Sequence, residues 1–371
     1  MIEINKKCDC TGCYACKSIC PKDCIDMQED DQGFRYPVVD RSKCVNCSMC
    51  ENICHMKKEL HPIKDALAYA AINKDINERM NSSSGGVFVE IAKWILGKGG
   101  SVYGAALNED NEVAHIRVTE IDELYKLQTS KYVQSIIGNA YVNAREDLEN
   151  GAPVLFTGTP CQIGGFRAFL RKDYDNLICQ DIMCHGVPSP KFWRKYLKEL
   201  NIGKINNIRF RDKSQGWSHY RVVIEGEKGS ISDEFNKNEY MRAFIADASL
   251  RPSCYECHYK HLNYEGDYFL ADFWGASEVC PELDDDKGVS LVIVNSEKGQ
   301  KTIDNIKDKL EMIAVDFDKA VSKNGAAING AAMNDKHTAL FDNIDRMTVH
   351  QIVEKYIRGS IFKRILNKLK R

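Results

Sequence analysis

The sequence predicts two consecutive units, a small α+β module crowded with cysteine and a larger mixed α/β domain. Three observations predict this division. Ten of the sixteen cysteines lie within the first 54 residues, in two copies of one spacing. Between the copies, apolar and β-forming residues flank Gly33, which indicates a hairpin over residues 25–40. Beyond residue 61, short strand patterns alternate with helical patterns, which favours a mixed α/β core.

Each copy of the repeated spacing reads C-x2-C-x2-C-x3-C. Three close cysteines can wrap one corner of a [4Fe-4S] cluster while the fourth reaches across to a second cluster, as in two-cluster bacterial ferredoxins. We therefore expect two clusters with crossed ligands. Cluster one is expected to take Cys10, Cys13, Cys16 and Cys54, and cluster two Cys44, Cys47, Cys50 and Cys20.

Zinc and disulfide bonds are the alternatives for these cysteines. Zinc usually takes two C-x2-C pairs separated by a longer loop, whereas three cysteines recur here at two-residue gaps. No signal peptide precedes the cysteines, so we expect a reducing compartment. Residues 1–57 resemble a bacterial-type two-[4Fe-4S] ferredoxin, with His55 where the second motif usually carries proline. Cys8 and Cys24 are expected to be packed small residues and not ligands.

Composition excludes several classes of function. The chain has 371 residues, a formal net charge of −2 and 43% hydrophobic residues, as is ordinary for a soluble globular protein. This charge gives no general attraction to nucleic acid. No apolar run approaches the roughly 18 residues that a membrane span needs. The N-terminus lacks a hydrophobic targeting region, so we expect a cytoplasmic protein.

A Ser/Gly stretch over residues 81–86 precedes the helical pattern of residues 87–100. Such a loop offers free N–H groups to a phosphate, although a simple helix cap explains it equally. Residues 101–107 and 113–119 are predicted to form paired strands. Residues 121–151 are predicted to be helical, with Lys131 inside a polar segment that either contacts a cofactor phosphate or is solvated.

Four more cysteines occur singly or in a pair near predicted strand ends: Cys161, Cys184, Cys254 and Cys257. A strand over residues 154–156 precedes the first, a helix is expected from about residue 162, and a strand over residues 268–276 follows the last. The positions allow a third [4Fe-4S] cluster. They equally allow zinc at the C-x2-C pair, completed by His258 or His261, with Cys161 as a redox thiol. Buried free cysteines, as expected for Cys179 and Cys280, are the third alternative.

Other polar residues give weaker signals. Arg209, Arg211 and Lys213 lie on a predicted strand and could meet an anion, but a solvated strand face is the favoured interpretation. His185 could donate a proton to a substrate, although a structural histidine is favoured. No side chain emerges as an obligatory catalytic acid or base, and no G-x-G-x-x-G nucleotide motif is found.

Several motifs in one order resemble the coenzyme F420 hydrogenase/dehydrogenase beta-subunit family, from residue 1 to about residue 340. After the two cysteine motifs these are SSSGG (82–86), KYVQS (131–135), GTPCQIGGFRAFL (158–170), CHGVPSP (184–190), the C-x2-C pair and ADFWG (271–275). One departure is Ala271, where a glycine is often found.

The resemblance implies an FAD-containing iron–sulfur oxidoreductase. Cys161, Cys184, Cys254 and Cys257 then correspond to the ligands of a third cluster beside the flavin, and Ser83, Ser84, Gly85, Gly86 and Lys131 to part of the FAD site. The ferredoxin domain would pass electrons to or from a flavin that exchanges a hydride with a small organic substrate. That substrate is F420 or, in a bacterium lacking it, another compound, for some relatives linked to surface-polysaccharide synthesis. The alternative is a non-catalytic electron-transfer subunit that relays charge to a partner enzyme.

The expected division is a two-cluster ferredoxin domain over residues 1–60, an FAD and iron–sulfur domain over 61–340, and a basic amphipathic C-terminal helix over 341–371. That helix either packs against its own domain, which is the favoured interpretation, or contacts an anionic membrane or a partner. The expected redox partner is a protein or a small-molecule electron donor.

Overall fold

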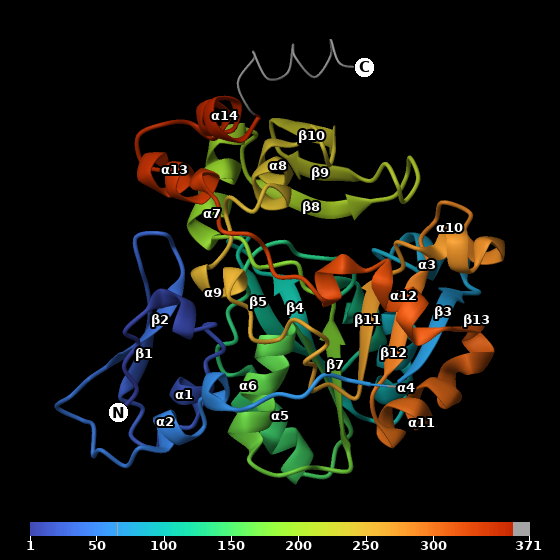
Figure 1. Cartoon of the computed structure of the whole chain (residues 1–371), viewed down its shortest axis with the longest axis horizontal. Coiled ribbons are helices and arrows are strands. Elements are labelled where there is room, and N and C mark those ends of the chain that lie inside the picture. Colours follow the sequence, from blue (N-terminus) through green and yellow to red (C-terminus); the bar gives the residue numbers. More distant parts are fainter. Residues whose placement is uncertain (65, 359–371) are drawn as a thin grey trace.

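The computed structural model of the protein describes residues 1–64 and 66–358 (Figure 1). Its strands form three sheets of two, three and eight strands. The N-terminal module packs at one side of the eight-stranded sheet, and the three-stranded sheet lies above it in Figure 1. A small module followed by a mixed α/β domain is therefore confirmed, and the separate three-stranded sheet is an addition to the predicted architecture.

The N-terminal module contains the predicted hairpin. Strands β1 (Ile25–Glu29) and β2 (Arg35–Val39) pair antiparallel around Gly33, whose φ of 84° requires a left-handed backbone. Each cysteine motif also forms one short helix, α1 (Ala15–Ser18) and α2 (Met49–Asn52).

The central sheet has the strand order β13-β3-β12-β11-β7-β6-β4-β5. Strands β4, β6, β7 and β11 are mutually parallel, and β12 is antiparallel to both β11 and β3. In this order the strands are β13 (Leu310–Val315), β3 (Leu67–Asn73), β12 (Ser290–Val294), β11 (Tyr268–Asp272), β7 (Leu177–Ile182), β6 (Val154–Gly158), β4 (Ser101–Leu107) and β5 (Val113–Val118).

Helices cover both faces of this sheet because neighbouring strand residues point to opposite sides. On β6, Leu155 joins the core under α4 (Val87–Leu96) and α11 (Glu297–Ile306). Its neighbour Phe156 joins the core under α5 (Ala140–Glu149) and α6 (Pro160–Leu170), where it stacks on Phe166 with ring centroids 4.2 Å apart.

Five strands of the central sheet end at the same edge. Since β12 is antiparallel to both β3 and β11, β3 runs in the same direction as the parallel group. The segments after β3, β4, β6, β7 and β11 therefore start at one edge of the sheet. Ligands of open α/β sheets bind at the carboxyl ends of parallel strands. This edge is thus where the sequence motifs after those strands meet.

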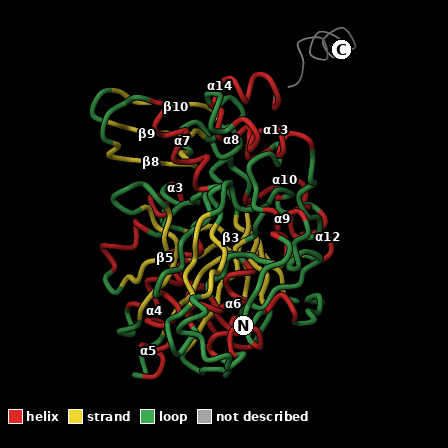
Figure 2. Tube along the Cα trace, turned by 90° about the vertical axis from the view of Figure 1, so that its left-hand side faces the viewer, coloured by secondary structure: helices red, strands yellow, loops and turns green. Residues whose placement is uncertain are grey.

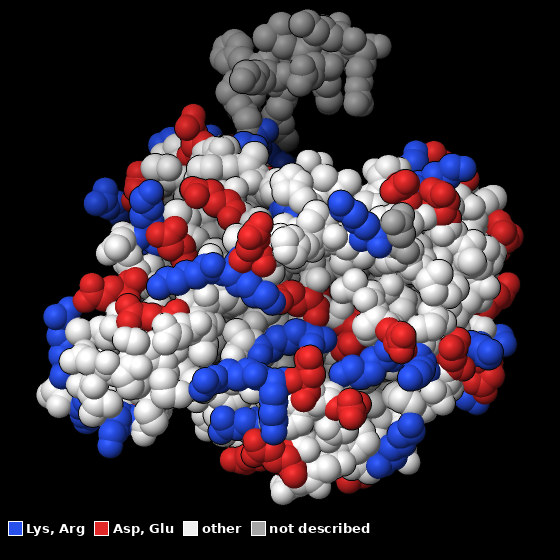
Figure 3. Space-filling model, turned by 60° about the horizontal axis from the view of Figure 1, so that its bottom comes forward, with Lys and Arg blue, Asp and Glu red and all other residues white. Residues whose placement is uncertain are grey.

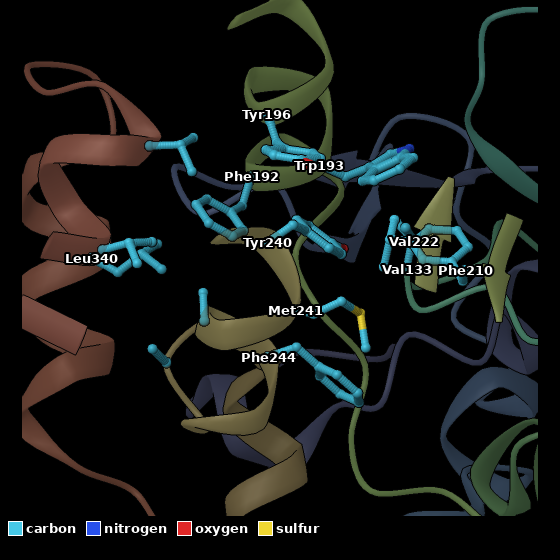
Figure 4. Close-up of a cluster of buried hydrophobic side chains, with 14 of the residues drawn as sticks. Val133, Phe192, Trp193, Tyr196, Phe210, Val222, Tyr240, Met241, Phe244 and Leu340 are labelled. Carbon is cyan, nitrogen blue, oxygen red and sulfur yellow. The ribbon is translucent and has the colours of Figure 1, made fainter. Parts of the chain in front are cut away.

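The three-stranded sheet belongs to a lobe with its own aromatic core (Figure 4). Trp193 contacts Phe210 and Tyr240, with centroids 4.9 and 4.8 Å away. Figures 1 and 2 both show this sheet apart from the central one. The lobe contains β8 (Ile205–Asp212), β9 (Arg221–Gly226), β10 (Gly229–Glu234), α7 (Pro190–Leu200), α8 (Glu239–Ile245), α13 (Asp335–Asn343) and α14 (Val349–Ile352).

The remaining helices are short: α3 (Ile76–Met80), α9 (Pro252–Tyr255), α10 (Ala276–Val279) and α12 (Phe317–Ser322). A π-helical turn, Val353–Ile357, continues α14, and Ile352 and Val353 are buried in the lobe core. The expected C-terminal helix over 341–371 lies outside the described residues beyond 358. Within residues 1–64 and 66–358, no helix has the length and apolarity of a membrane span.

Three sequence expectations require correction. Helix α6 begins at Pro160, so Cys161 lies inside its first turn. Residues 121–151 form a 3-10 helix, Ile121–Lys126, and α5, and the segment around Lys131 between them is not helical. Strand β11 ends at Asp272, because the chain turns away before Trp274.

Acidic and basic side chains are interspersed on the face shown in Figure 3. This mixture agrees with a formal net charge of only −2 for the chain.

Gly33→Ala should destabilise the protein more than Gly99→Ala. Both glycines have positive φ, so both changes carry a backbone cost of about 1–2 kcal/mol. A Cβ at residue 33 would lie 2.4 Å from Cβ of Lys191, whereas nothing lies within 4 Å at residue 99. Thermal unfolding of the two variants measures the difference, and equal losses would contradict this account of the hairpin contact.

Candidate metal centres and cofactor site

The first group of thiols lines one cavity of the N-terminal module. The cavity is bounded by Cys10, Cys13 and Cys16 of the first motif and by Cys54 of the second. Burial, with a smaller contribution from the neighbouring Cys10 and Cys54, raises the pKa of Cys13 to about 12. Such thiols ionise when a bound cation replaces their protons, as cluster ligation requires.

The second group lines another cavity, bounded by Cys44, Cys47, Cys50 and, from the first motif, Cys20. The buried Cys24 lines it as well, and its Sγ lies 3.4 Å from Sγ of Cys20. Cys24 is therefore packed, as expected, but against a candidate ligand.

Each cavity thus combines three cysteines of one motif with the fourth cysteine of the other. This is the arrangement that crossed ligation requires, and the donor set fits two [4Fe-4S] clusters. Among the described residues, no three His, Cys, Asp or Glu side chains form a site for a single metal ion. The individual ligand assignments remain predictions.

The four later cysteines come together at the carboxyl edge of the sheet. Cys161 lies in the first turn of α6 after β6, Cys184 follows β7, and Cys254 lies on α9 with Cys257 just beyond it. Burial, with a smaller contribution from Cys257, raises the pKa of both Cys184 and Cys254 to about 12. Cys184 and Cys257 likewise raise the pKa of Cys161 beyond the effect of its burial. Four thiols from three loops therefore share one buried neighbourhood.

Of the two histidines expected to complete a zinc site, His258 and His261, the first has a hydrogen-bond partner. Nε2 of His258 lies 2.8 Å from the carbonyl oxygen of Lys58, to which the ring must donate. By contrast, Cys254 and Cys257 have two further cysteines as neighbours. The proximity of the four thiols, and not the His258 contact, favours a site of four cysteines over one completed by histidine.

The module approaches this third site through helix α6. A Cβ at Gly165 would lie 2.9 Å from Sγ of Cys13, and one at Gly164 would lie 1.8 Å from Oη of Tyr259. The two glycines of the GG pair therefore allow two close approaches that alanine would prevent. The Tyr259 hydroxyl also lies 2.7 Å from Nδ1 of His55.

The contacts of the His55 ring give a physical reason for a histidine at the position where the second motif usually carries proline. Its Nε2 lies 3.3 Å from Oγ1 of Thr11, while its Nδ1 contacts Tyr259. Burial lowers the pKa of His55 to about 3, so the ring is neutral at physiological pH. The residue links the two halves of the module to the larger domain.

The Ser/Gly loop follows α3 at the same edge of the sheet. Ser83 Oγ accepts hydrogen bonds from the backbone N–H and the hydroxyl of Ser130, at 2.8 and 3.0 Å. Ser84 donates to the carbonyl of Val289. A Cβ at Gly85 would lie 2.2 Å from a backbone oxygen of β3, and Gly86, with φ of 86°, caps α4. Both glycines thus have structural reasons to be present.

The half-buried Lys131 and the buried Lys213 lie near this loop, and neither has a carboxylate partner among the contacts of the described residues. Lys131 donates to the carbonyls of Lys126 and Gln128, and Lys213 donates to those of Arg79, Ser84 and Lys287. Burial lowers the pKa of each lysine to about 7. Lys131 keeps one ammonium N–H without a partner among these contacts.

The expectation that Arg209, Arg211 and Lys213 form a solvated strand face is wrong for two of these three residues. Arg211 and Lys213 are buried, because β8 faces the central sheet, while Arg209 is half exposed. Arg211 pairs with Asp272 at 2.7 Å and donates to the carbonyl of Ser83 at 3.2 Å. It therefore connects the end of β11 to the Ser/Gly loop.

The sequence did not single out the aromatic pair beside this ion pair. Trp217 donates from Nε1 to Asp272 at 3.1 Å and contacts Trp274, with ring centroids 4.8 Å apart. Trp274 is 58% exposed. His185 follows β7 next to Cys184, and its Nε2 lies 2.6 Å from Oδ1 of Asp247, so its structural role stays a prediction.

Comparison with known families decides the identity of the two units. Residues 9–58 match the family described as "4Fe-4S dicluster domain". Residues 151–319 match the family that describes the C terminus of the coenzyme F420 hydrogenase/dehydrogenase beta subunit. The chain joins a 4Fe-4S dicluster domain to the C-terminal domain of the F420 hydrogenase/dehydrogenase beta-subunit family. The resemblance inferred from the motifs is confirmed.

Individual proteins add little to this family assignment. One similar solved structure is that of the F420-reducing [NiFe] hydrogenase complex from Methanosarcina barkeri, derivatized with xenon. The similarity covers 68% of this chain and 83% of that chain, at 12% identity and a TM-score of 0.45. No curated protein matches the chain.

Cys54→Ser should remove or alter the cluster bound by the first motif, although residue 54 belongs to the second. The reason is that Cys54 lines the cavity of Cys10, Cys13 and Cys16. Electron paramagnetic resonance (EPR) of the reduced protein should show Cys54→Ser and Cys13→Ser affecting one signal and Cys20→Ser another. Cys8→Ser is the control and should leave both signals intact. A shared signal for Cys54→Ser and Cys47→Ser would contradict crossed ligation.

Proposed function

We propose that this chain is an oxidoreductase that passes electrons between [4Fe-4S] clusters and an FAD. In this proposal a ferredoxin domain over residues 1–60 exchanges electrons with the flavin of a domain over residues 61–340. The observation that carries the proposal is the succession of three four-thiol groups, the last at the sheet edge that also bears the Ser/Gly loop.

Electrons enter or leave at cluster two in this account. Cys47 is exposed, and the neighbouring Val45 is 58% exposed, so a redox partner protein or a small donor can approach there. Cys13 of the other group faces Gly165 of α6, one helical turn from Cys161. The residues thus support an order from cluster two through cluster one to the third group.

The Ser/Gly loop and Lys131 fit the anionic diphosphate of FAD. A lysine whose buried ammonium has only carbonyl partners gains a counter-charge when an anion binds, which offsets the cost of burial. Ser83 lies beside it through Ser130 and can present its hydroxyl to the same group. Helix α4 begins directly after this loop, so its N-terminus adds further N–H donors.

When bound, the clusters supply one-electron transfer and the flavin supplies hydride exchange with a small organic substrate. The substrate is F420 or another small molecule of similar redox chemistry. Trp274 and Trp217 offer an aromatic surface to a planar ring at this edge. The ion pair of Arg211 and Asp272 holds that surface in place through the Trp217 indole. These side chains orient the reactants, and the cofactors carry the chemistry.

Anaerobically purified protein should contain about twelve iron atoms and one FAD per chain, since each of three clusters holds four irons. Cys161→Ser should lower the iron content to about eight while leaving the two ferredoxin clusters in place. Cys280→Ser replaces a buried cysteine outside the three groups and is the matched control. Iron, sulfide and flavin quantification on one sample measures all of these values.

Lys131→Met should reduce the bound flavin at least tenfold, whereas Lys126→Met should not. The Lys126 side chain pairs with Glu123 and contributes only its backbone carbonyl to Lys131. Eight irons and no flavin in the unmodified protein would reject the oxidoreductase and leave a ferredoxin domain on a scaffold.

A further inference from the structure

Arg251 is a completely buried cation between cluster one and the third group of thiols. Its exposed fraction is 0%. It is the N-cap residue of α9, the helix that carries Cys254, and its backbone carbonyl accepts from the Cys254 N–H at 2.9 Å. Its side chain points the other way, into the N-terminal module. One residue of the larger domain therefore contacts a candidate ligand of cluster one and a candidate ligand of the third group.

The guanidinium group of Arg251 contacts both the backbone carbonyl and the sulfur of Cys10, a candidate ligand of cluster one. Nε donates to the Cys10 carbonyl at 2.8 Å, and one Nη lies 3.7 Å from the Cys10 sulfur. The remaining hydrogen bonds go to the carbonyl of Arg35 and to the side chain of Gln134, each at 3.0 Å. Gln134 in turn donates to the carbonyl of Thr11, next to Cys10.

The surroundings of Arg251 leave its charge directed at the cluster. Among the described residues, its only hydrogen-bond acceptor able to carry a negative charge is the Cys10 sulfur. The guanidinium also lies over the rings of Tyr36 and Phe34, at 4.2 and 5.5 Å, so these rings limit access of water. A cation in such a site exerts a strong electrostatic effect because screening is weak.

Arg194 crosses the same interface in a different way. It pairs with Glu29 at 2.6 Å and with Glu112 at 2.7 Å, and its side chain is 38% exposed. Its charge is neutralised locally. The contrast shows that docking the module on the larger domain does not itself require an arginine without a carboxylate partner.

We propose that Arg251 is a positioning residue that raises the reduction potential of cluster one relative to cluster two. The proposal rests on the proposed function, because it presumes electron flow through the module. Reduction adds one electron and no proton to the cluster, and the adjacent buried cation stabilises the added negative charge. Net charge and hydrogen bonds to the sulfurs are established determinants of cluster potential. Electrons that enter at cluster two are thereby drawn to the cluster facing α6.

Arg251→Gln tests the proposal in the full-length holoprotein. At a fixed solution potential the reduced-to-oxidised ratio of cluster one should fall at least tenfold, which is about 59 mV for a one-electron couple. The measurement is a dithionite titration followed by EPR, with the cluster-one signal identified by its change in Cys10→Ser. Arg194→Gln is the matched control, and its cluster-one potential should stay unchanged.

Gln134→Glu provides a second variant that keeps Arg251 in place. The new carboxylate would neutralise the guanidinium from 3.0 Å and should lower the cluster-one potential in the same direction. Intact clusters with an unchanged potential in both variants would overturn the role of Arg251 and leave the proposed function standing. A protein without iron in its unmodified form would instead reject the proposed function.

Discussion

The close packing of the cysteine-rich module on helix α6 is the constraint on which the rest of the structure depends. Gly164 and Gly165 have no side chains, so Tyr259 and Cys13 can approach the backbone of α6 closely. The same helix begins beside Cys161 and follows a strand of the central sheet. One close packing connection between the module and the third thiol group therefore passes through this helix.

Buried charge reinforces this arrangement on both sides. Arg251 brings a cation to Cys10, and Lys131 and Lys213 bring two more to the Ser/Gly loop. Each is held by neutral backbone or amide acceptors, so its charge remains available to an anionic neighbour. Clusters with four thiolates and a diphosphate are both anionic groups. The positions of these cations consequently follow the proposed path of electrons, from the module to the carboxyl edge of the sheet.

The sequence predicted what depends on local patterns. The cysteine spacing predicted the two groups in the module, and turn and strand patterns predicted the hairpin and the strands β4, β5, β6 and β11 of the central sheet. It did not predict the burial and contacts of residues whose surroundings depend on packing between distant segments of the chain. Arg211 and Lys213 looked solvated because strand alternation does not reveal that β8 covers the central sheet. Arg251 and Tyr259 gave no signal, since their roles arise only when segments some 200 residues apart meet.

The most direct test of the central claim is pulsed EPR of the fully reduced protein, which detects magnetic coupling between neighbouring clusters. The account predicts that cluster one is coupled both to cluster two and to a third cluster beside α6. It also predicts that Cys161→Ser removes only the second of these couplings. Coupling between two clusters alone, unchanged by Cys161→Ser, would contradict the placement of a third cluster next to the module.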